Sequence, residues 1–161
     1  MGDERGNFPL GTGPEEEPGF LLWKTTITWK SIVKKVLEPH KLSHPQFVIL
    51  ALLLWFYSKR AVATQIDLVR MSKLDKMTVS KSLKGLVDKK IVKRIENIDD
   101  SRAKSVYLTE SGKSLIQKVL PIVTDAEANF FNQLNTDNRK CLIRSLQKLC
   151  MNQHEFLGIK F

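Results

Sequence analysis

The feature that most constrains this fold is a helix-forming segment that runs directly into two short strands. Residues 75–90 place aliphatic side chains on one side of a helix and lysines on the other, which is typical of a helix lying on a core. Residues 91–95 and 105–109 have the character of strands, and the polar stretch 97–103 between them favours a turn. A helix followed by a hairpin predicts a mainly α fold with a small two- or three-stranded sheet, which we call the wing.

Apolar periodicity and capping signals predict three helices ahead of this segment. Residues 20–37 form the first helix. Residues 43–46, Ser-His-Pro-Gln, form a capping box that opens the second. That helix continues through the apolar run 47–57, which is too short to span a bilayer and is typical of a buried helix. Residues 64–67, Thr-Gln-Ile-Asp, provide a similar cap for a short third helix.

The third and fourth helices are predicted to form a helix-turn-helix. We expect Ile66 and Val69 to make the apolar side of the third helix, and residues 72–74 to make a tight turn. Asp75 then caps the fourth helix, because a carboxylate is favoured at a helix N-terminus. The spacing of this helix directs four aliphatic side chains to the core and six residues elsewhere. The core residues are Val79, Leu83, Leu86 and Val87, and the others are Lys76, Met77, Thr78, Ser80, Lys81 and Lys84.

Two further helices are predicted after the wing. Thr109 is expected to cap a long fifth helix, residues 110–134, in which Pro121 should introduce a kink. Thr136 is expected to cap the sixth helix. The fifth helix has two apolar faces, with Leu115, Val119, Ile122, Ala126 and Phe130 on one and Ile116, Leu120, Val123, Phe131 and Leu134 on the other.

Surplus apolar surface on the terminal helices favours a homodimer. The first helix has two apolar stripes and therefore needs two packing partners. Exposed in a monomer, such surface would be a liability, so a dimer built from both ends of the chain is favoured. Deep burial of the first helix in its own core is the open alternative. The stripes of the first helix are Leu22, Trp29, Val33 and Val36, and Phe20, Trp23 and Ile27; the sixth helix carries Leu142, Leu146, Leu149 and Cys150.

The two cysteines, Cys141 and Cys150, argue against a disulfide-stapled secreted fold. Their spacing in one predicted helix points them to roughly opposite faces. We expect buried thiols, since the alternative, an oxidant sensor, needs an exposed thiol with a lowered pKa. The acidic N-terminus shows no secretion signal, so we expect a cytoplasmic protein that does not associate with a membrane.

The positive charge of the chain is unevenly distributed. The net charge is +9, residues 1–17 hold five acids and one base, and residues 58–104 hold 13 bases and 6 acids. A local excess of this kind attracts phosphates or acidic membranes, although a lysine-rich solvated surface is the plainer interpretation. The fourth helix and the basic turn with Arg102 and Lys104 would present cations together. This combination favours double-stranded DNA, with the helix in a major groove and the wing tip at a neighbouring minor groove.

The order of these elements, together with several residue strings, resembles the MarR family of bacterial winged-helix transcription regulators. The resemblance runs from about Ser43 to Leu134. Its strings are Gln46-Phe47-Val48-Ile49-Leu50, Thr64-Gln65, residues 75–81, residues 86–94, and the wing pattern Asp100-x-Arg102 followed by Leu108-Thr109 and Gly112.

The resemblance implies a winged-helix dimer that binds a pseudo-palindromic operator, usually as a repressor. Arg102 falls where the family places a wing arginine near the minor groove, positioned by Asp100. Ser101 departs from the basic residue of many members, which implies a weaker contact there. The residues that fall where the family reads the major groove are Met77, Thr78, Ser80 and Lys81.

The resemblance also implies a small-molecule effector. Members of the family often bind small aromatic anions between the winged-helix lobe and the dimer helices, which lowers DNA affinity. Trp23, Trp29 and Trp55 are expected to be core or dimer residues rather than ligand contacts. The residues Glu38, His40 and His44 are too loosely spaced for a metal site, so we expect no metal.

We expect four parts in the chain: a flexible tail, 1–19; an N-terminal dimerisation helix, 20–42; a winged helix-turn-helix DNA-binding lobe, 43–109; and C-terminal dimerisation helices, 110–161. No nucleophilic triad or phosphate loop is visible, so we expect neither an enzyme nor a cofactor. The alternative function is a winged-helix module that binds another protein. That alternative predicts an exposed apolar patch on the wing or the fourth helix, where this chain has lysines, with Met77 as the large exposed apolar candidate.

Overall fold

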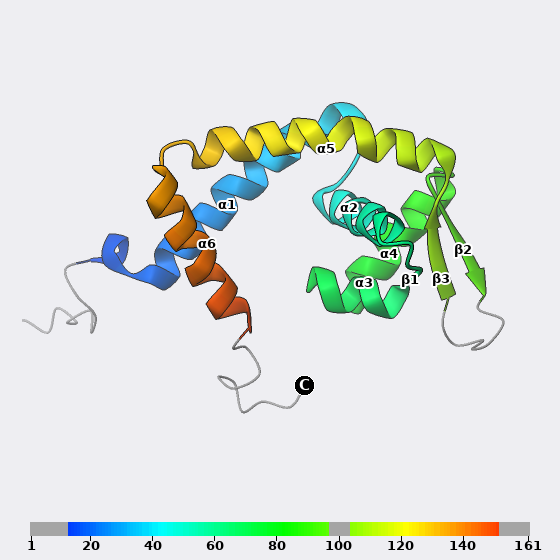
Figure 1. Ribbon diagram of the computed structural model, residues 1–161, viewed down its shortest axis with the longest axis horizontal. Coiled ribbons are helices and arrows are strands. Elements are labelled where there is room, and N and C mark those ends of the chain that lie inside the picture. Colours follow the sequence, from blue (N-terminus) through cyan, green and yellow to red (C-terminus); the bar gives the residue numbers. More distant parts are fainter. Residues whose placement is uncertain (1–12, 97–103, 152–161) are drawn as a thin grey trace, which may run out of the picture. The chain divides into compact units, whose positions relative to one another are not determined.

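The computed structural model describes residues 13–96 and 104–151 of the chain. It is mainly helical with a small antiparallel sheet (Figure 1), as the sequence predicts. The chain divides into two compact units, one ending at Thr124 and the other beginning at Asp125. The elements in chain order are η1 (Pro14–Glu16), α1 (Pro18–Leu37), η2 (Glu38–His40), α2 (His44–Ser58), β1 (Ala63–Thr64), α3 (Gln65–Ser72), α4 (Lys76–Asp88), β2 (Val92–Glu96), β3 (Lys104–Leu108), α5 (Glu110–Phe131) and α6 (Thr136–Met151).

Both predicted capping boxes are present. The Ser43 hydroxyl accepts from the Gln46 N–H at 3.3 Å, and the Gln46 side chain accepts from the Ser43 N–H at 3.1 Å. Thr64 and Asp67 make the same reciprocal pair at 3.2 and 3.0 Å. These caps satisfy amides that have no partner inside the helix, and they therefore determine where α2 and α3 begin.

The core of the first unit lies between α2, α3, α4 and the sheet. The helix α3 differs from the prediction, because Leu68 is its fully buried residue whereas Ile66 is 69% exposed. Leu68 reaches the core because α3 packs between α2 and α4, and this turns Ile66 toward solvent. The helix α4 agrees with the prediction in its buried face of Val79, Leu83 and Leu86, with Val87 packed against it.

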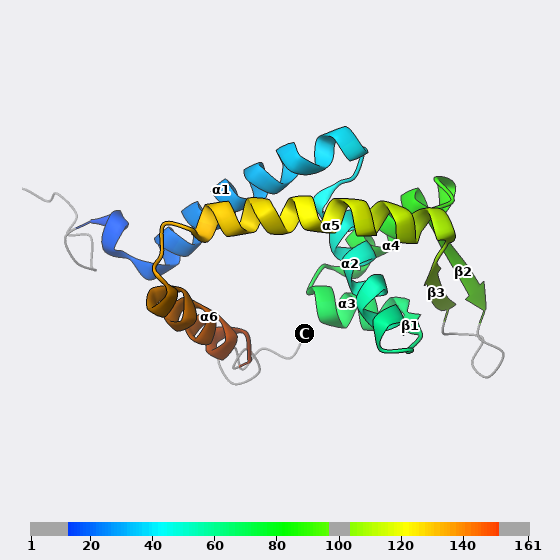
Figure 2. The ribbon, with the colours of Figure 1, turned by 45° about the horizontal axis from the view of Figure 1, so that its top comes forward.

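The wing is a three-stranded sheet in the order β1–β3–β2. Its strands are antiparallel, with Val92 opposite Leu108 and Ala63 opposite Val106. The sheet lies beside the start of α5 (Figure 2). The predicted turn, residues 97–103, lies outside the described residues. We call the part of the first unit from α2 to β3 the winged-helix lobe.

Thr109 caps α5 as predicted, because its hydroxyl accepts from the Gly112 N–H at 3.1 Å. The helix continues through Pro121 and ends at Phe131. Within the first unit its buried residues are drawn from both predicted faces. They are Gly112, Ile116, Val119 and Val123.

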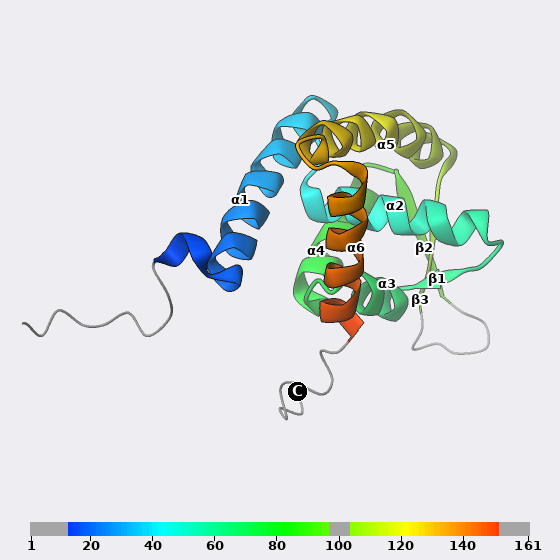
Figure 3. The same ribbon diagram turned by 60° about the vertical axis from the view of Figure 1, so that its left-hand side comes forward.

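Helical structure at the N-terminus begins earlier than predicted, since η1 covers Pro14–Glu16 and α1 starts at Pro18. A proline at the first helical position has its backbone angle already set for a helix, which explains the early start. The C-terminal half of α1 buries Val33 and Leu37. Its N-terminal half leaves the lobe (Figure 3), and it exposes large apolar side chains: Leu21, Leu22, Trp23 and Ile27.

The second unit contains the end of α5 and the whole of α6. Its cap differs from the prediction, because Asn135 rather than Thr136 accepts a hydrogen bond, from the Asn138 N–H at 2.8 Å. The expectation of buried thiols is also wrong for this chain, in which Cys141 and Cys150 are both free and exposed. The cause is that α6 has no buried residue at all. In the described part of the chain, no helix is both long enough and apolar enough to cross a bilayer.

Candidate nucleic-acid interface

The exposed side of α4 carries the residues that the sequence singled out. Three fully buried residues hold the opposite side on the core, so the exposed side faces away from the lobe. Met77 is 80% exposed, and Thr78 is half-buried. The remaining exposed residues of the predicted set are Lys76, Ser80, Lys81 and Lys84.

The first turn of α4 is fixed by Asp75. Its carboxylate accepts from the Thr78 hydroxyl at 2.6 Å and from the Thr78 N–H at 2.8 Å. These two hydrogen bonds lower the pKa of the Asp75 carboxyl below its usual value, because they stabilise the charged form. The side chain of Thr78 is therefore held in one position on the face of the helix.

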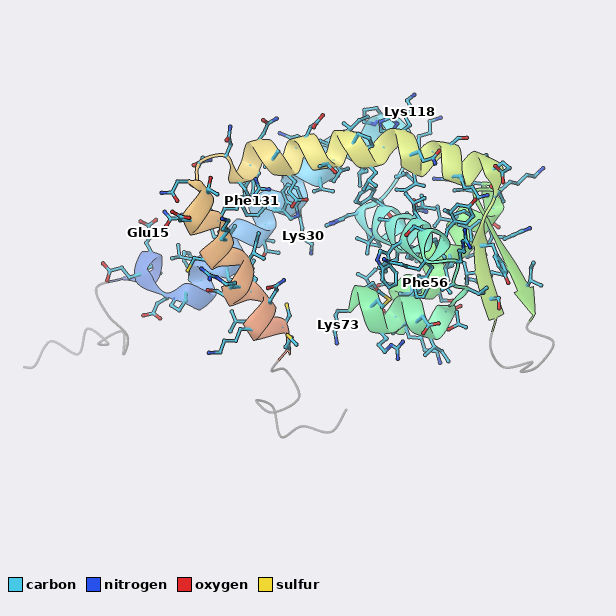
Figure 4. The ribbon with its side chains drawn as sticks, in the orientation of Figure 1. Glu15, Lys30, Phe56, Lys73, Lys118 and Phe131 are labelled. Atoms are coloured by element: carbon cyan, nitrogen blue, oxygen red, sulfur yellow. The ribbon has the colours of Figure 1, made fainter. Side chains whose placement is uncertain are left out.

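The turn between α3 and α4 gives the helix-turn-helix its geometry. Lys73 adopts a left-handed conformation with φ of 56°, and its N–H donates to the Val69 carbonyl at 3.1 Å. The next amide, that of Leu74, donates to the Ser72 hydroxyl at 3.2 Å. Figure 4 shows the Lys73 side chain pointing away from the lobe, on the same side of the molecule as α3. The predicted tight turn at 72–74 is confirmed.

The wing residues of the predicted site are only partly described. Asp100 and Arg102 lie outside the described residues, and Lys104 is described only as the first backbone position of β3. The structure adds Arg94, which lies opposite Val106 and so shares the inward face of β2 with Val92. Its guanidinium Nη2 donates to the Ser80 carbonyl of α4 at 3.4 Å. Arg94 thus connects the wing to the exposed side of α4. Sequence reasoning missed it, although its alternation with Val92 was the available signal.

A groove of about 510 Å³ lies between the N-terminus of α2 and α4. Nothing in the sequence pattern indicated it, because its two walls are more than thirty residues apart. Gly85 lets the helices approach closely, since a Cβ at this position would lie 3.0 Å from Gln46 Nε2. The lining residues are Ser43, Pro45, Gln46, Thr78, Lys81, Ser82, Lys84, Gly85 and Asp88.

A second cleft, of about 460 Å³, lies between α1, η2 and the start of α2. Lys30, Lys34 and Lys41 line it, with Glu38 the acidic residue of the lining. The pKa of His44 is lowered, first because burial disfavours its charged form and second because Lys30 repels a positive charge. Cations therefore dominate this cleft. The described residues contain no cluster of three or more acidic, histidine or cysteine side chains that could hold a metal ion.

A smaller cleft of about 230 Å³ lies between the end of α2, the wing and the start of α5. The ammonium of Lys113 lies 4.4 Å from the Tyr57 ring centroid and 2.8 Å from Glu110 Oε1. Glu110 raises the pKa of Lys113 mainly through that hydrogen bond. No tryptophan lines any of these three clefts in the described part of the chain.

Comparison with known proteins gives consistent relatives. Residues 38–126 match the family of ArnR1-like winged-helix domains. The helix-turn-helix transcriptional regulator YdcH of Bacillus subtilis is 35% identical over 120 residues, which cover 74% of this chain and 82% of YdcH.

Two solved structures share the fold. Escherichia coli MarR C80S in complex with operator DNA matches with a TM-score of 0.72 and 23% identity, over 81% of this chain and 91% of MarR. Bordetella bronchiseptica BpsR, whose DNA binding is regulated by 6-hydroxynicotinic acid, matches with a TM-score of 0.73 and 24% identity, over 82% of this chain and 97% of BpsR. At these identities the likeness is one of fold.

Proposed function

Because the chain belongs to the MarR family of winged-helix transcription regulators, we propose that it binds a specific pseudo-palindromic operator as a homodimer and represses transcription from it. The observation that carries this proposal is the exposed side of α4, where lysines, hydroxyls and Met77 project from a helix whose other side is fixed in the core. Lysines attract backbone phosphates, and side-chain donors near the start of such a helix can reach base edges in a major groove.

The homodimer part of the proposal rests on uncovered apolar surface at both ends of the chain. The N-terminal half of α1 exposes Trp23 at 60% and Ile27 at 51%, and α6 exposes Leu149 at 64%. Solvent-exposed apolar surface of this extent on two helices favours association with a second copy. A two-fold dimer would present two α4 helices to successive major grooves, which matches the symmetry of a pseudo-palindrome.

Selection of bound sequences from random duplex DNA tests the proposal. We expect a symmetric motif whose half-sites lie roughly 34 Å apart, about one helical turn. Affinity for that motif should fall steeply with salt, because lysines that neutralise phosphates release counterions. Recovery of no motif, with weak binding that ignores sequence, would instead favour the alternative of a winged-helix module that binds another protein.

Relief by a small aromatic acid is the finer part of the proposal. The cleft between α1 and α2 supports it, because three lysines and His44 surround a volume suited to a small organic anion. The relative BpsR responds to 6-hydroxynicotinic acid. A ligand can act only by favouring one arrangement of the two α4 helices over another, and ligand and DNA must then weaken each other by the same factor. Titration of aromatic acids, followed by tryptophan fluorescence and by operator affinity, is the test. A ligand that binds tightly yet leaves operator affinity unchanged would rule out an effector role.

A further inference from the structure

The groove between α2 and α4 contains hydrogen-bond donors that have no acceptor among the residues that the structure describes. Ser82 is buried in the wall of this groove, at 8% exposure. Its hydroxyl makes no hydrogen bond to a described residue, and the oxygen keeps access to the groove, since Arg94 Nε is the buried side-chain atom without a partner in the described part of the chain. Ser80, on the solvent side of α4, is exposed to water, whereas Ser82 lines the groove. This hydroxyl can therefore donate to water or to a group that enters the groove.

Gln46 supplies a second donor on the opposite wall. Its carbonyl oxygen Oε1 is occupied by the capping box, because it accepts from the Ser43 N–H. This arrangement turns the amide nitrogen Nε2 toward Gly85 and the groove. Nε2 has no acceptor among the described residues. The capping hydrogen bond holds the Gln46 carbonyl oxygen, so the amide nitrogen, a hydrogen-bond donor, faces the groove.

The charge at the groove favours an anion. Lys81 and Lys84 of α4 lie along it, and Asp88 is its acidic residue. The N-terminus of α2 adds the positive end of a helix dipole to the same wall. An occupant must therefore accept hydrogen bonds, carry negative charge and offer more than one oxygen. A phosphate diester fits this description, whereas a base edge, which also presents donors, fits it less well.

We propose that the groove between Gln46 and Ser82 binds a backbone phosphate of the DNA duplex, and so fixes how deeply α4 enters the major groove. This inference rests on the proposed function and adds a phosphate contact from α2 that lies outside α4. Gln46 Nε2 and the Ser82 hydroxyl donate to the non-bridging oxygens, and Lys84 neutralises the charge. Such a contact orients the protein on the duplex without reading sequence.

Two substitutions test this proposal on the full-length protein and the duplex recovered by selection. Ser82→Ala removes the hydroxyl, and Gln46→Glu keeps the capping acceptor but replaces the donor by a negative charge. We expect each to lower operator affinity at least about tenfold, since hydrogen bonds to charged groups are strong. The matched controls are Ser114→Ala and Gln117→Glu, at exposed positions of α5, which should change affinity little.

Stability separates a phosphate contact from a structural role. Ser82→Ala removes a hydroxyl that makes no hydrogen bond to a described residue, so its unfolding midpoint in urea should equal or exceed that of the wild type. If Ser82→Ala lowers operator affinity while its free energy of unfolding stays unchanged or rises, the result supports the proposed phosphate contact. Loss of stability in proportion to loss of affinity would overturn it, because the hydroxyl would then serve the fold.

Single methylphosphonate replacements in the duplex identify the phosphate. One neutral phosphate in each half-site should weaken wild-type binding about tenfold and Ser82→Ala binding by a clearly smaller factor, because the variant has already lost one of the contacts to that phosphate. Equal sensitivity of both proteins at every phosphate would overturn the inference while leaving sequence-specific binding intact. Absence of selective binding by the wild type would instead overturn the proposed function. A third outcome would also overturn the inference. If the wild type binds inorganic phosphate saturably and Ser82→Ala abolishes that binding without changing operator affinity, the groove is a site for free anions.

Discussion

Gly112 lies where the first turn of α5 meets the beginning of the wing. A Cβ at this position would collide with the Ile91 carbonyl oxygen, which also accepts from the Thr109 N–H at 3.1 Å. We therefore expect Gly112→Ala to destabilise the protein by about 1–3 kcal/mol, the usual cost of overpacking. Urea unfolding measures this. Gly19→Ala is the control, because nothing lies within 4 Å of that site and it should be neutral or slightly stabilising.

The cap at Asp75 gives a pH-dependent prediction at the same scale. Hydrogen bonds from Thr78 lower the folded-state pKa of this carboxyl below its unfolded value of about 3.9. A depressed pKa means that the stabilisation is complete above that unfolded value and is lost as pH falls through the folded one. Asp75→Asn keeps a neutral cap, so the stability difference between the two proteins should shrink below pH 4 or so. A difference that stays constant across that range would contradict the assignment.

At the scale of the element, short polar signals predicted where four of the helices begin, whereas the sequence did not predict which face of a short helix is buried. Ser43, Thr64, Asp75 and Thr109 all cap the helices that the sequence assigned to them, because a cap depends on residues three positions apart. Leu68 was missed because an eight-residue helix gives too few turns for periodicity to choose between faces.

Features built by distant segments were also beyond sequence reasoning. The strand β1 has two residues and exists through its pairing with β3. The groove of Gln46 and Ser82 depends on the close approach of α2 and α4 at Gly85. The exposed residues of α4 were predictable because helical spacing alone separates them from the core. Their contact with Arg94 was not, since it requires the position of the wing.

The fourth helix and the wing should contribute differently to DNA binding. Lys81 is exposed near the start of α4, and Lys81→Ala should cost about 1–3 kcal/mol and relax preference at one base position if it contacts a base edge. Arg102→Ala, by contrast, should weaken binding to all sequences and reduce the salt slope by about one unit. Lys118→Ala, on the exposed side of α5 (Figure 4), removes the same charge elsewhere. If Arg102→Ala leaves both affinity and salt slope unchanged, the wing assignment is wrong.

At the scale of the whole molecule, association determines whether two copies of α4 can act together. The helix α6 has no buried residue in the single chain, yet Leu142 and Leu146 follow one another at helical spacing, with Leu146 36% exposed. Two half-sites bound by one rigid dimer gain affinity because the second contact is intramolecular. A monomer would retain only one set of phosphate and base contacts.

Replacing Leu142 and Leu146 together by glutamate should therefore produce monomers or aggregates and abolish binding to the symmetric operator. The charges would have to be buried unpaired in the interface, which is strongly unfavourable. Gln147→Glu, at an exposed position of the same helix, adds negative charge without removing apolar surface and should leave the dimer intact. Sedimentation equilibrium gives the oligomeric state, and anisotropy with the full operator and with an isolated half-site gives the affinities. The double variant should bind the full operator no more tightly than it binds the isolated half-site. A wild-type chain that sediments as a stable monomer at micromolar concentration, and binds both duplexes equally, would mean that the apolar faces of α1 and α6 have another partner.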